Sequence, residues 1–241
     1  MKALVLSDIH ANQPALEAVL ADAKAFDTVW ILGDLTGYGA APNECITRVR
    51  SLPQVLCLTG NHDTAVLNLI GIEDFNDEAR QAVTWTAGVI SKSNIEYLSS
   101  RLDREVADSC TLVHASPRHP VWEYILDTYT AKINFNYFNT DLCLIGHTHI
   151  PSIFRLLGNH HIKLEIPSPG KPIQLKGRVI LNPGSVGQPR DHNPSASYMI
   201  LDTENHTCEY YRVAYDIRAA QERILEAGLP PNHAYRLAMG Y

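Results

Sequence analysis

Five short apolar runs in this chain each end at a cluster of histidine, aspartate or asparagine residues. The runs are ALVL, TVWIL, VLCLT, CTLV and LCLI, and each has the length and composition of a buried strand. The clusters that follow them are Asp8-Ile9-His10, Gly33-Asp34, Gly60-Asn61-His62-Asp63, His114 and Gly146-His147-Thr148-His149. Ligands of α/β sheets bind at the carboxyl ends of the strands. The pattern therefore predicts an α/β fold whose strand ends share one binuclear metal site.

Size and charge narrow the class of protein. A chain of 241 residues suits one large domain, which we expect over residues 1–241. The net charge of −6 and the lack of like-charge runs argue against an extended nucleic-acid surface. The first apolar stretch has four residues, too short for a signal peptide or membrane span. Five cysteines without CxxC spacing indicate a reducing compartment. We therefore expect a cytoplasmic protein with no membrane partner, and the oligomeric state stays open.

Helix signals alternate with strand signals in the first half of the chain. Pro14 and Pro42 each suit the first position of a helix between two of the apolar runs. This β-α-β-α-β order predicts a mainly parallel, covered sheet. Further on, a helix followed by a polar connection is expected over residues 76–102, and a short helix over 131–138.

The pattern changes after Pro151. Two hairpins are expected, one formed by 153–157 with 162–166 and one by 197–201 with 208–213. A final helix is predicted over 217–227, ended by Gly228 and two prolines. Parallel units followed by hairpins predict two sheets packed face to face, with helices outside.

The spacing of the clusters indicates how they bind metal. Asp8 and His10 are two residues apart, as are His147 and His149, and extended residues at that spacing point the same way. The donors are oxygen and nitrogen only, which suits Mn, Fe, Zn, Co or Ni. Two such ions about 3.5–4 Å apart can stabilise both the attacking and the leaving oxygen of a phosphoryl displacement.

Together these motifs resemble the calcineurin-like metallophosphoesterase family, whose pattern is D-x-H, G-D, G-N-H-D/E, H and G-H-x-H. The match extends from Asp8 to His149 with no motif missing. The later Asn182-Pro183-Gly184-Ser185 also resembles a turn of the small bacterial members. The resemblance implies a four-layer α-β-β-α sandwich that contains two divalent metal ions.

The resemblance also implies a role for each motif residue. Seven residues would bind the two ions: Asp8, His10 and His149 the first, Asn61, His114 and His147 the second, with Asp34 bridging. The imidazole of His62 would protonate the leaving oxygen, and the neighbouring Asp63 would orient it. A hydroxide bridging the metals would attack phosphorus.

Candidate substrate residues come from the loops. Arg118 and Arg190 each lie in a proline-containing loop, and a guanidinium binds phosphate bidentately, although a surface arginine is the alternative reading. Tyr38 follows Gly37 and either lines the pocket or packs in the core. Trp122 and Tyr124 form a stacking wall or belong to the core. Four histidines outside the motifs are expected to be solvated: His160, His161, His206 and His233.

These features predict a metal-dependent phosphoester hydrolase, with a phosphodiesterase acting on a small soluble phosphorylated substrate as the first reading. The alternative within enzymes is a phosphomonoesterase, including a protein phosphatase. A further alternative is a non-catalytic, metal-binding regulatory protein. That class should lack ligands or the acid, whereas this chain has every ligand and His62.

Overall fold

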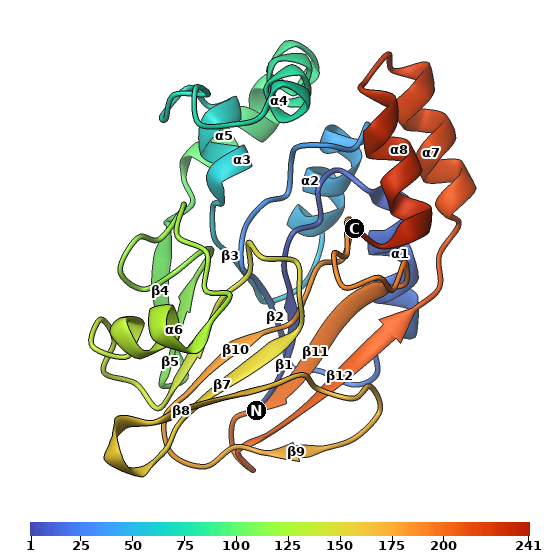
Figure 1. Ribbon diagram of the computed structural model, residues 1–241. Helices are drawn as coiled ribbons and strands as arrows, with labels where there is room; N and C mark the ends of the chain where they lie inside the picture. The colour runs from blue at the N-terminus through green and yellow to red at the C-terminus, as the bar shows by residue number, and fades with distance from the viewer.

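The computed structural model describes residues 1–241 and contains two six-stranded sheets (Figure 1). The first sheet has the order β3 (Val55–Cys57), β2 (Thr28–Ile31), β1 (Lys2–Leu6), β11 (Ala196–Asp202), β12 (Thr207–Val213), β9 (Ile173–Gln174). The second has the order β4 (Arg104–Ala107), β5 (Cys110–Val113), β6 (Leu142–Leu144), β10 (Val179–Asn182), β7 (Ser152–Leu156), β8 (Ile162–Glu165). The predicted α/β fold class is confirmed.

Both sheets combine parallel and antiparallel pairs. In the first sheet β1 pairs in parallel with β2 and antiparallel with β11. In the second sheet β6 lies in parallel between β5 and β10, and β10 pairs antiparallel with β7. The late strands therefore complete the sheets begun by the early ones. This arrangement brings the ends of β1, β2, β5 and β6 to one edge of the sandwich.

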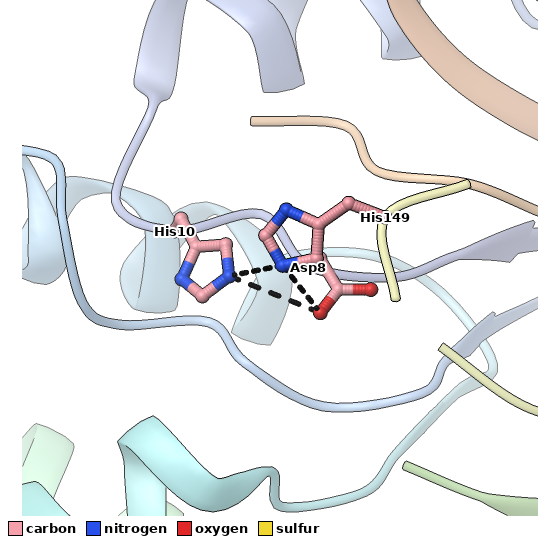
Figure 2. Close-up of side chains that lie close together, drawn as sticks. All are labelled: Asp8, His10 and His149. Atoms are coloured by element: carbon pink, nitrogen blue, oxygen red, sulfur yellow. Dashed lines mark hydrogen bonds and ion pairs between the residues drawn. The ribbon is translucent and has the colours of Figure 1, made fainter. Parts of the chain in front are cut away.

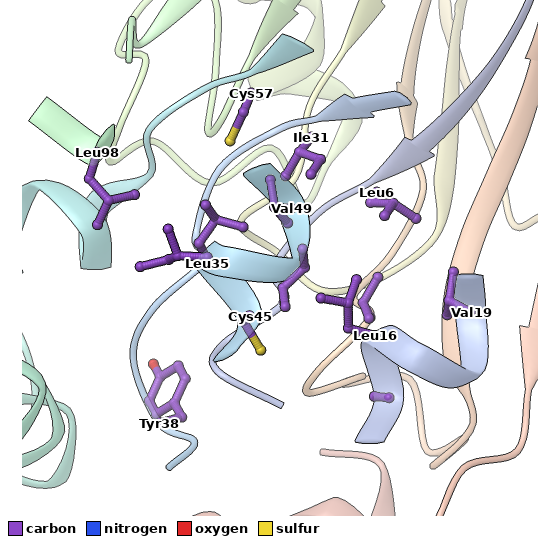
Figure 3. Packing of buried hydrophobic residues seen from close by; sticks show 14 of the residues in the cluster. Leu6, Leu16, Val19, Ile31, Leu35, Tyr38, Cys45, Val49, Cys57 and Leu98 are labelled. Atoms are coloured by element: carbon purple, nitrogen blue, oxygen red, sulfur yellow. The ribbon is translucent and has the colours of Figure 1, made fainter. Parts of the chain in front are cut away.

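Apolar clusters separate the layers. Between the sheets, Val5 and Trp30 pack with Leu112 and Leu181 of the opposite sheet. The outer face of the first sheet packs against α1 (Gln13–Asp22) and α2 (Pro42–Arg50), as the cluster in Figure 3 shows. The second sheet is covered by α6 (Thr128–Asn134). The order of layers is the expected α-β-β-α, with one short helix on the second sheet.

The segment between β3 and β4 contains more helix than expected. The helix expected at the start of 76–102 is α4 (Asp77–Val89), but the expected polar connection contains a second helix, α5 (Lys92–Ser99), because Ser91 caps it by accepting the Asn94 N–H at 3.3 Å. The Gly60-Asn61-His62-Asp63 turn continues into a short helix, α3 (Asn61–Val66). No helix has both the length and the apolar character needed to cross a membrane.

The C-terminus contains a second helix that the sequence reading missed. The helix α7 (Ile217–Glu226) ends just before Gly228, as predicted, and this glycine has a left-handed φ of +68°. The prolines that follow start another helix, α8 (Pro231–Met239), instead of ending the fold. Ile224 of α7 and Leu237 of α8 pack with Ala82 of α4. The two helices, the C-terminal hairpin, therefore pack beside α1 and α4 (Figure 1).

Candidate metal centre

The predicted ligands lie just beyond the strand ends, in tight turns. Five of them have left-handed backbone angles, with φ between 48° and 65°: Asp8, His10, Asp34, His147 and His149. The expectation that pairs such as Asp8 and His10 share a face because they are extended is wrong. Their side chains converge because the left-handed turns after the strands direct them to the same side. Left-handed angles in residues other than glycine cost about 1–3 kcal/mol each and cluster at functional sites.

Asp8, His10 and His149 form the first cluster (Figure 2). The two Nε2 atoms of the histidines lie 3.1 Å apart, and Oδ1 of Asp8 is 3.3 Å from Nε2 of His149. The Nδ1 atoms contact backbone carbonyls instead, that of Thr36 at 2.8 Å and that of Gln188 at 2.6 Å. Each carbonyl accepts the Nδ1 proton, so both Nε2 lone pairs face the centre of the cluster, as in metal-binding histidines.

The second cluster is built in the same way around His114. Its Nδ1 donates to the carbonyl of Leu32 at 2.9 Å, and its Nε2 lies 3.1 Å from Oδ1 of Asn61. Oδ2 of Asp34 is 3.4 Å from that Nε2 and 3.6 Å from Nε2 of His10. The Asp34 carboxylate therefore lies between the two clusters, where a bridging ligand would lie.

His147 completes the second cluster with the opposite ring nitrogen. Its Nε2 lies 3.2 Å from the carbonyl of Trp122, which leaves Nδ1 for a metal. The ring of Tyr124 stacks on it at 3.9 Å between centroids, with 24° between planes. The backbone N–H of His147 also donates to Oδ2 of Asp8 at 3.0 Å, so this residue links the two clusters.

The protonation states suit divalent cations. Burial lowers the pKa of His147 to about 3 and also lowers the pKa values of His10 and His149, so these rings are neutral. Burial opposes ionisation of Asp34, but the neighbouring His114 outweighs it and holds the pKa of that carboxyl well below its usual range. The Asp34 charge likewise overcomes burial and raises the pKa of His114 to about 9, so this ring is protonated in the metal-free protein and would release a proton when it binds a metal. Neutral imidazoles and ionised carboxylates are the forms that bind metal.

His62 lies beside both clusters. Its ring meets that of His10 edge-on at 4.9 Å, and its backbone N–H donates to Oδ1 of Asp34 at 2.9 Å. Its Nδ1 is buried without a hydrogen-bond partner. Burial lowers the pKa of His62 to about 4. The ring is close enough to His10 and Asp34 to act as a ligand too, so its role as an acid requires a test.

The expected contact between Asp63 and His62 is absent. The Asp63 carboxylate accepts the backbone N–H of Leu35 at 3.1 Å, of Thr36 at 2.9 Å and of Gly60 at 3.1 Å. It therefore ties the start of α3 to the loop that carries Asp34, and it does not orient the His62 imidazole directly. Burial, with the Asp34 charge adding to it, raises the pKa of Asp63 to about 6.

A cavity of about 90 Å³ opens beside the clusters, with His62, Tyr38, Trp122, Tyr124 and Arg190 in its lining. Nη2 of Arg190 donates to Oε1 of Gln188 at 2.9 Å and to the Tyr38 hydroxyl at 3.3 Å. Arg190, Tyr38, Trp122 and Tyr124 therefore line one cavity beside the clusters, and Tyr38 also belongs to the buried cluster of the first sheet. Phe75 also lines this cavity, and no sequence motif marked it.

Arg118 is placed differently. Its guanidinium pairs with the Glu123 carboxylate, which also accepts hydrogen bonds from Ser116 and Asn134 at 2.7 Å each. Arg118 does not line the cavity. The structure therefore gives no support to the prediction that Arg118 binds substrate, because a carboxylate five residues later in the chain already pairs with its charge.

Comparison with known proteins agrees with this geometry. Residues 1–206 match the calcineurin-like phosphoesterase superfamily domain. An uncharacterised protein of Methanocaldococcus jannaschii is 39% identical over 98% of this chain and 97% of its own. The crystal structure of a metallophosphoesterase from Sphaerobacter thermophilus is 42% identical and superposes with a TM-score of 0.90 over 100% of this chain and 99% of its own. A hypothetical protein of Pyrococcus horikoshii, 20% identical, has a TM-score of 0.82 over 100% and 98%. The chain belongs to the calcineurin-like phosphoesterase superfamily.

Proposed function

We propose that this protein is a phosphodiesterase that binds two divalent metal ions and hydrolyses a small phosphorylated substrate. The observation that carries the proposal is the orientation of the imidazoles. His10, His114 and His149 each direct Nδ1 at a backbone carbonyl and Nε2 at a carboxylate or amide oxygen, or at each other. In His10 and His149, which are neutral, this arrangement leaves the Nε2 lone pairs free for a metal; in His114 a metal would replace the Nε2 proton.

The donor set fits two ions. Asp8, His10 and His149 would hold one, and Asn61, His114 and His147 the other, with Asp34 shared. When bound, a pair of divalent ions supplies Lewis acidity and a water activated for attack on phosphorus. Asn61 and Arg190 both line the cavity; the Asn61 amide would contact the phosphoryl group, and Arg190 would neutralise its outer oxygens.

His62 is the proposed proton donor to the leaving oxygen. Its Nδ1 makes no hydrogen bond within the protein, and its side chain lines the cavity. The lowered pKa favours a neutral ring in the free protein. A phosphate anion bound in the cavity would raise that pKa, because a nearby negative charge favours the protonated imidazole. Substrate binding would thus favour the protonated form of His62, which is the form that can donate a proton to the leaving oxygen.

The count of fixed cations favours a diester. A monoester carries two charges and a diester one, and Arg190 is the single arginine or lysine in the cavity lining. The pairing of Arg118 with Glu123 removes the second arginine that the sequence offered. With less charge to neutralise, a diester needs fewer cations beyond the metals.

Matched aryl esters test this proposal. Manganese-loaded protein is assayed with bis(nitrophenyl) phosphate and with nitrophenyl phosphate, at the same pH and metal concentration. We expect the higher kcat/KM for the diester. A clear preference for the monoester would favour the phosphatase alternative. Binding of metal without hydrolysis of either ester would favour a regulatory protein.

A further inference from the structure

The C-terminal hairpin reaches the cavity through one buried histidine. His233, on α8, is 1% exposed, which corrects the expectation that it is solvated. Its ring meets the ring of Tyr38 edge-on, with centroids 4.9 Å apart and 86° between planes. Tyr38 in turn lies 4.5 Å from the His62 ring and contacts Arg190 through its hydroxyl. A contact path therefore joins α8 to the residue proposed to bind phosphate.

The conformation of Tyr38 needs such support. Its φ is 57°, a left-handed angle that is unfavourable for a bulky aromatic residue. The preceding Gly37 has a φ of 90°, and a Cβ there would lie 2.3 Å from Nδ1 of His62. This turn is strained and tightly enclosed, so a neighbour such as His233 that fills the space behind the ring helps to hold it.

The same hairpin also holds the loop that carries Arg190. The backbone N–H of His192 donates to the carbonyl of Gly240, at the end of α8, at 2.8 Å. Gly240 has a left-handed φ of 68°, and a Cβ there would lie 2.6 Å from the backbone of Asn193. Two separate points of the hairpin thus contact the two sides of the Arg190–Tyr38 pair.

The feature of position 233 that contacts Tyr38 is an aromatic ring and not a hydrogen bond from its nitrogens. Neither ring nitrogen of His233 has a hydrogen-bond partner, and the nearest carboxylate oxygen, Oε2 of Glu78, is 3.9 Å away. Burying an unpaired polar ring is unfavourable compared with burying an aliphatic side chain. The aromatic edge that it presents to Tyr38 is the feature an aliphatic side chain lacks.

We propose that the C-terminal hairpin is a positioning element for phosphate recognition, in which His233 and Gly240 hold Tyr38 and the Arg190 loop so that the guanidinium faces the substrate. This inference rests on the proposed role of Arg190 in phosphate binding. The C-terminal hairpin lies beyond residues 1–206, the segment that matches the family, and the proposal makes it part of the substrate-binding site. His233 acts through Tyr38 and does not touch the substrate.

The test is a double-mutant cycle read out by binding of inorganic phosphate to the manganese-loaded protein. We expect Arg190→Ala and His233→Ala each to weaken phosphate binding about tenfold, and the double variant to be no weaker than Arg190→Ala, because coupled residues are not additive. His233→Phe, which keeps an aromatic edge, should restore most of the affinity. Additive losses, or an unchanged affinity in His233→Ala, would overturn the inference.

Leu229→Ala is the matched control. Leu229 is buried in the same hairpin cluster but does not line the cavity. It should lower Tm without changing phosphate affinity, and equal weakening in this variant would show that the hairpin matters only for stability. If His233→Ala fails to fold, His233→Phe and Tyr38→Phe carry the cycle: His233→Phe should bind phosphate nearly as wild type, whereas Tyr38→Phe, which removes the hydroxyl contact with Arg190, should bind it more weakly.

The phosphate readout also separates this inference from the proposed function. If the protein hydrolyses no ester yet binds phosphate through Arg190 and His233, the proposed function fails and the inference stands. If Arg190→Ala binds phosphate as tightly as the wild type, the inference fails whatever the activity.

Discussion

Two polar clusters in this molecule satisfy their charges in opposite ways. Around Glu123, the carboxylate accepts hydrogen bonds from Ser116, Asn134 and Arg118, so donors and acceptors match within the protein. In the candidate metal centre, the Nε2 atoms of His10 and His149 lie 3.1 Å apart with their protons on the opposite nitrogens. The first cluster has a donor for each acceptor. In the second, two unprotonated ring nitrogens face each other, and no proton lies between them.

The difference separates a structural network from a binding site. Both clusters are rich in charged residues, and both contain a residue that the sequence marked for function. What distinguishes them is the balance of donors and acceptors, because a buried polar group must be paired. Lone pairs that converge from neutral imidazoles and ionised carboxylates are balanced by a cation.

The largest effect is expected at the acid. His62→Ala should keep two metal ions but lose about 10²–10⁴-fold in kcat for a diester with a poor leaving group. The loss should be smaller for nitrophenolate, which barely needs a proton. Steady-state kinetics on both esters, with metal content measured in parallel, checks this. Loss of metal would show instead that His62 is a ligand, as its proximity to His10 and Asp34 allows.

A ligand should behave differently from the acid. Asp8→Asn removes a charge from the first cluster, so the affinity for one metal should fall, by about 10–100-fold or more, and activity should fall for good and poor leaving groups alike. Metal titration followed by activity at limiting metal makes the measurement. Wild-type turnover with full metal content under those conditions would place Asp8 outside the ligand set.

The two arginines give a direct contrast between the clusters. Arg190→Ala should lower kcat/KM about 10–100-fold, since the side chain lines the cavity and a charge-assisted bond to phosphate is lost. Arg118→Ala should leave kcat/KM within about twofold at temperatures where the protein is folded, because its charge is already paired with Glu123. Equal losses in both variants would show that the two arginines do not differ in their contribution to substrate binding.

The smallest effect concerns stability. Burial alone would raise the pKa of Glu123, but hydrogen bonds, first from Arg118, lower it to about 2. A depressed carboxyl pKa contributes stability that is present above about pH 4.5 and is lost as pH falls towards 2. Glu123→Gln should therefore destabilise the protein by about 1–3 kcal/mol at pH 7. The deficit in thermal unfolding should narrow as the pH falls below 4.5, and a pH-independent deficit would argue against a charged network.

The sequence predicted most of the sandwich and the composition of the centre. The five apolar runs became strands β1, β2, β3, β5 and β6, and the motif residues after them lie together. Hydrophobic periodicity and the signals at strand and helix ends depend on neighbouring residues in the sequence, so these elements could be predicted without the fold. The left-handed turns that aim Asp8 and His10 could not, because a histidine or aspartate adopts positive φ only when the surrounding structure requires it.

Contacts that form only in the folded chain account for what the sequence did not show. Arg190 and Tyr38 are 152 residues apart, and nothing in either loop shows that they meet. Arg118 looked as free as Arg190, and its partner Glu123 is identifiable only once the loop is folded. His233 was expected in solvent because α8 was not predicted, and without that helix its burial against Tyr38 could not be inferred.

The central claim is that seven residues bind two ions with Asp34 between them. Crystals grown with manganese and examined by anomalous diffraction test it most directly. The account predicts two anomalous peaks per chain, about 3.5–4 Å apart, with Asp34 oxygens about 2.0–2.2 Å from each ion. A single peak, or an Asp34 carboxylate more than about 3 Å from either ion, would contradict it.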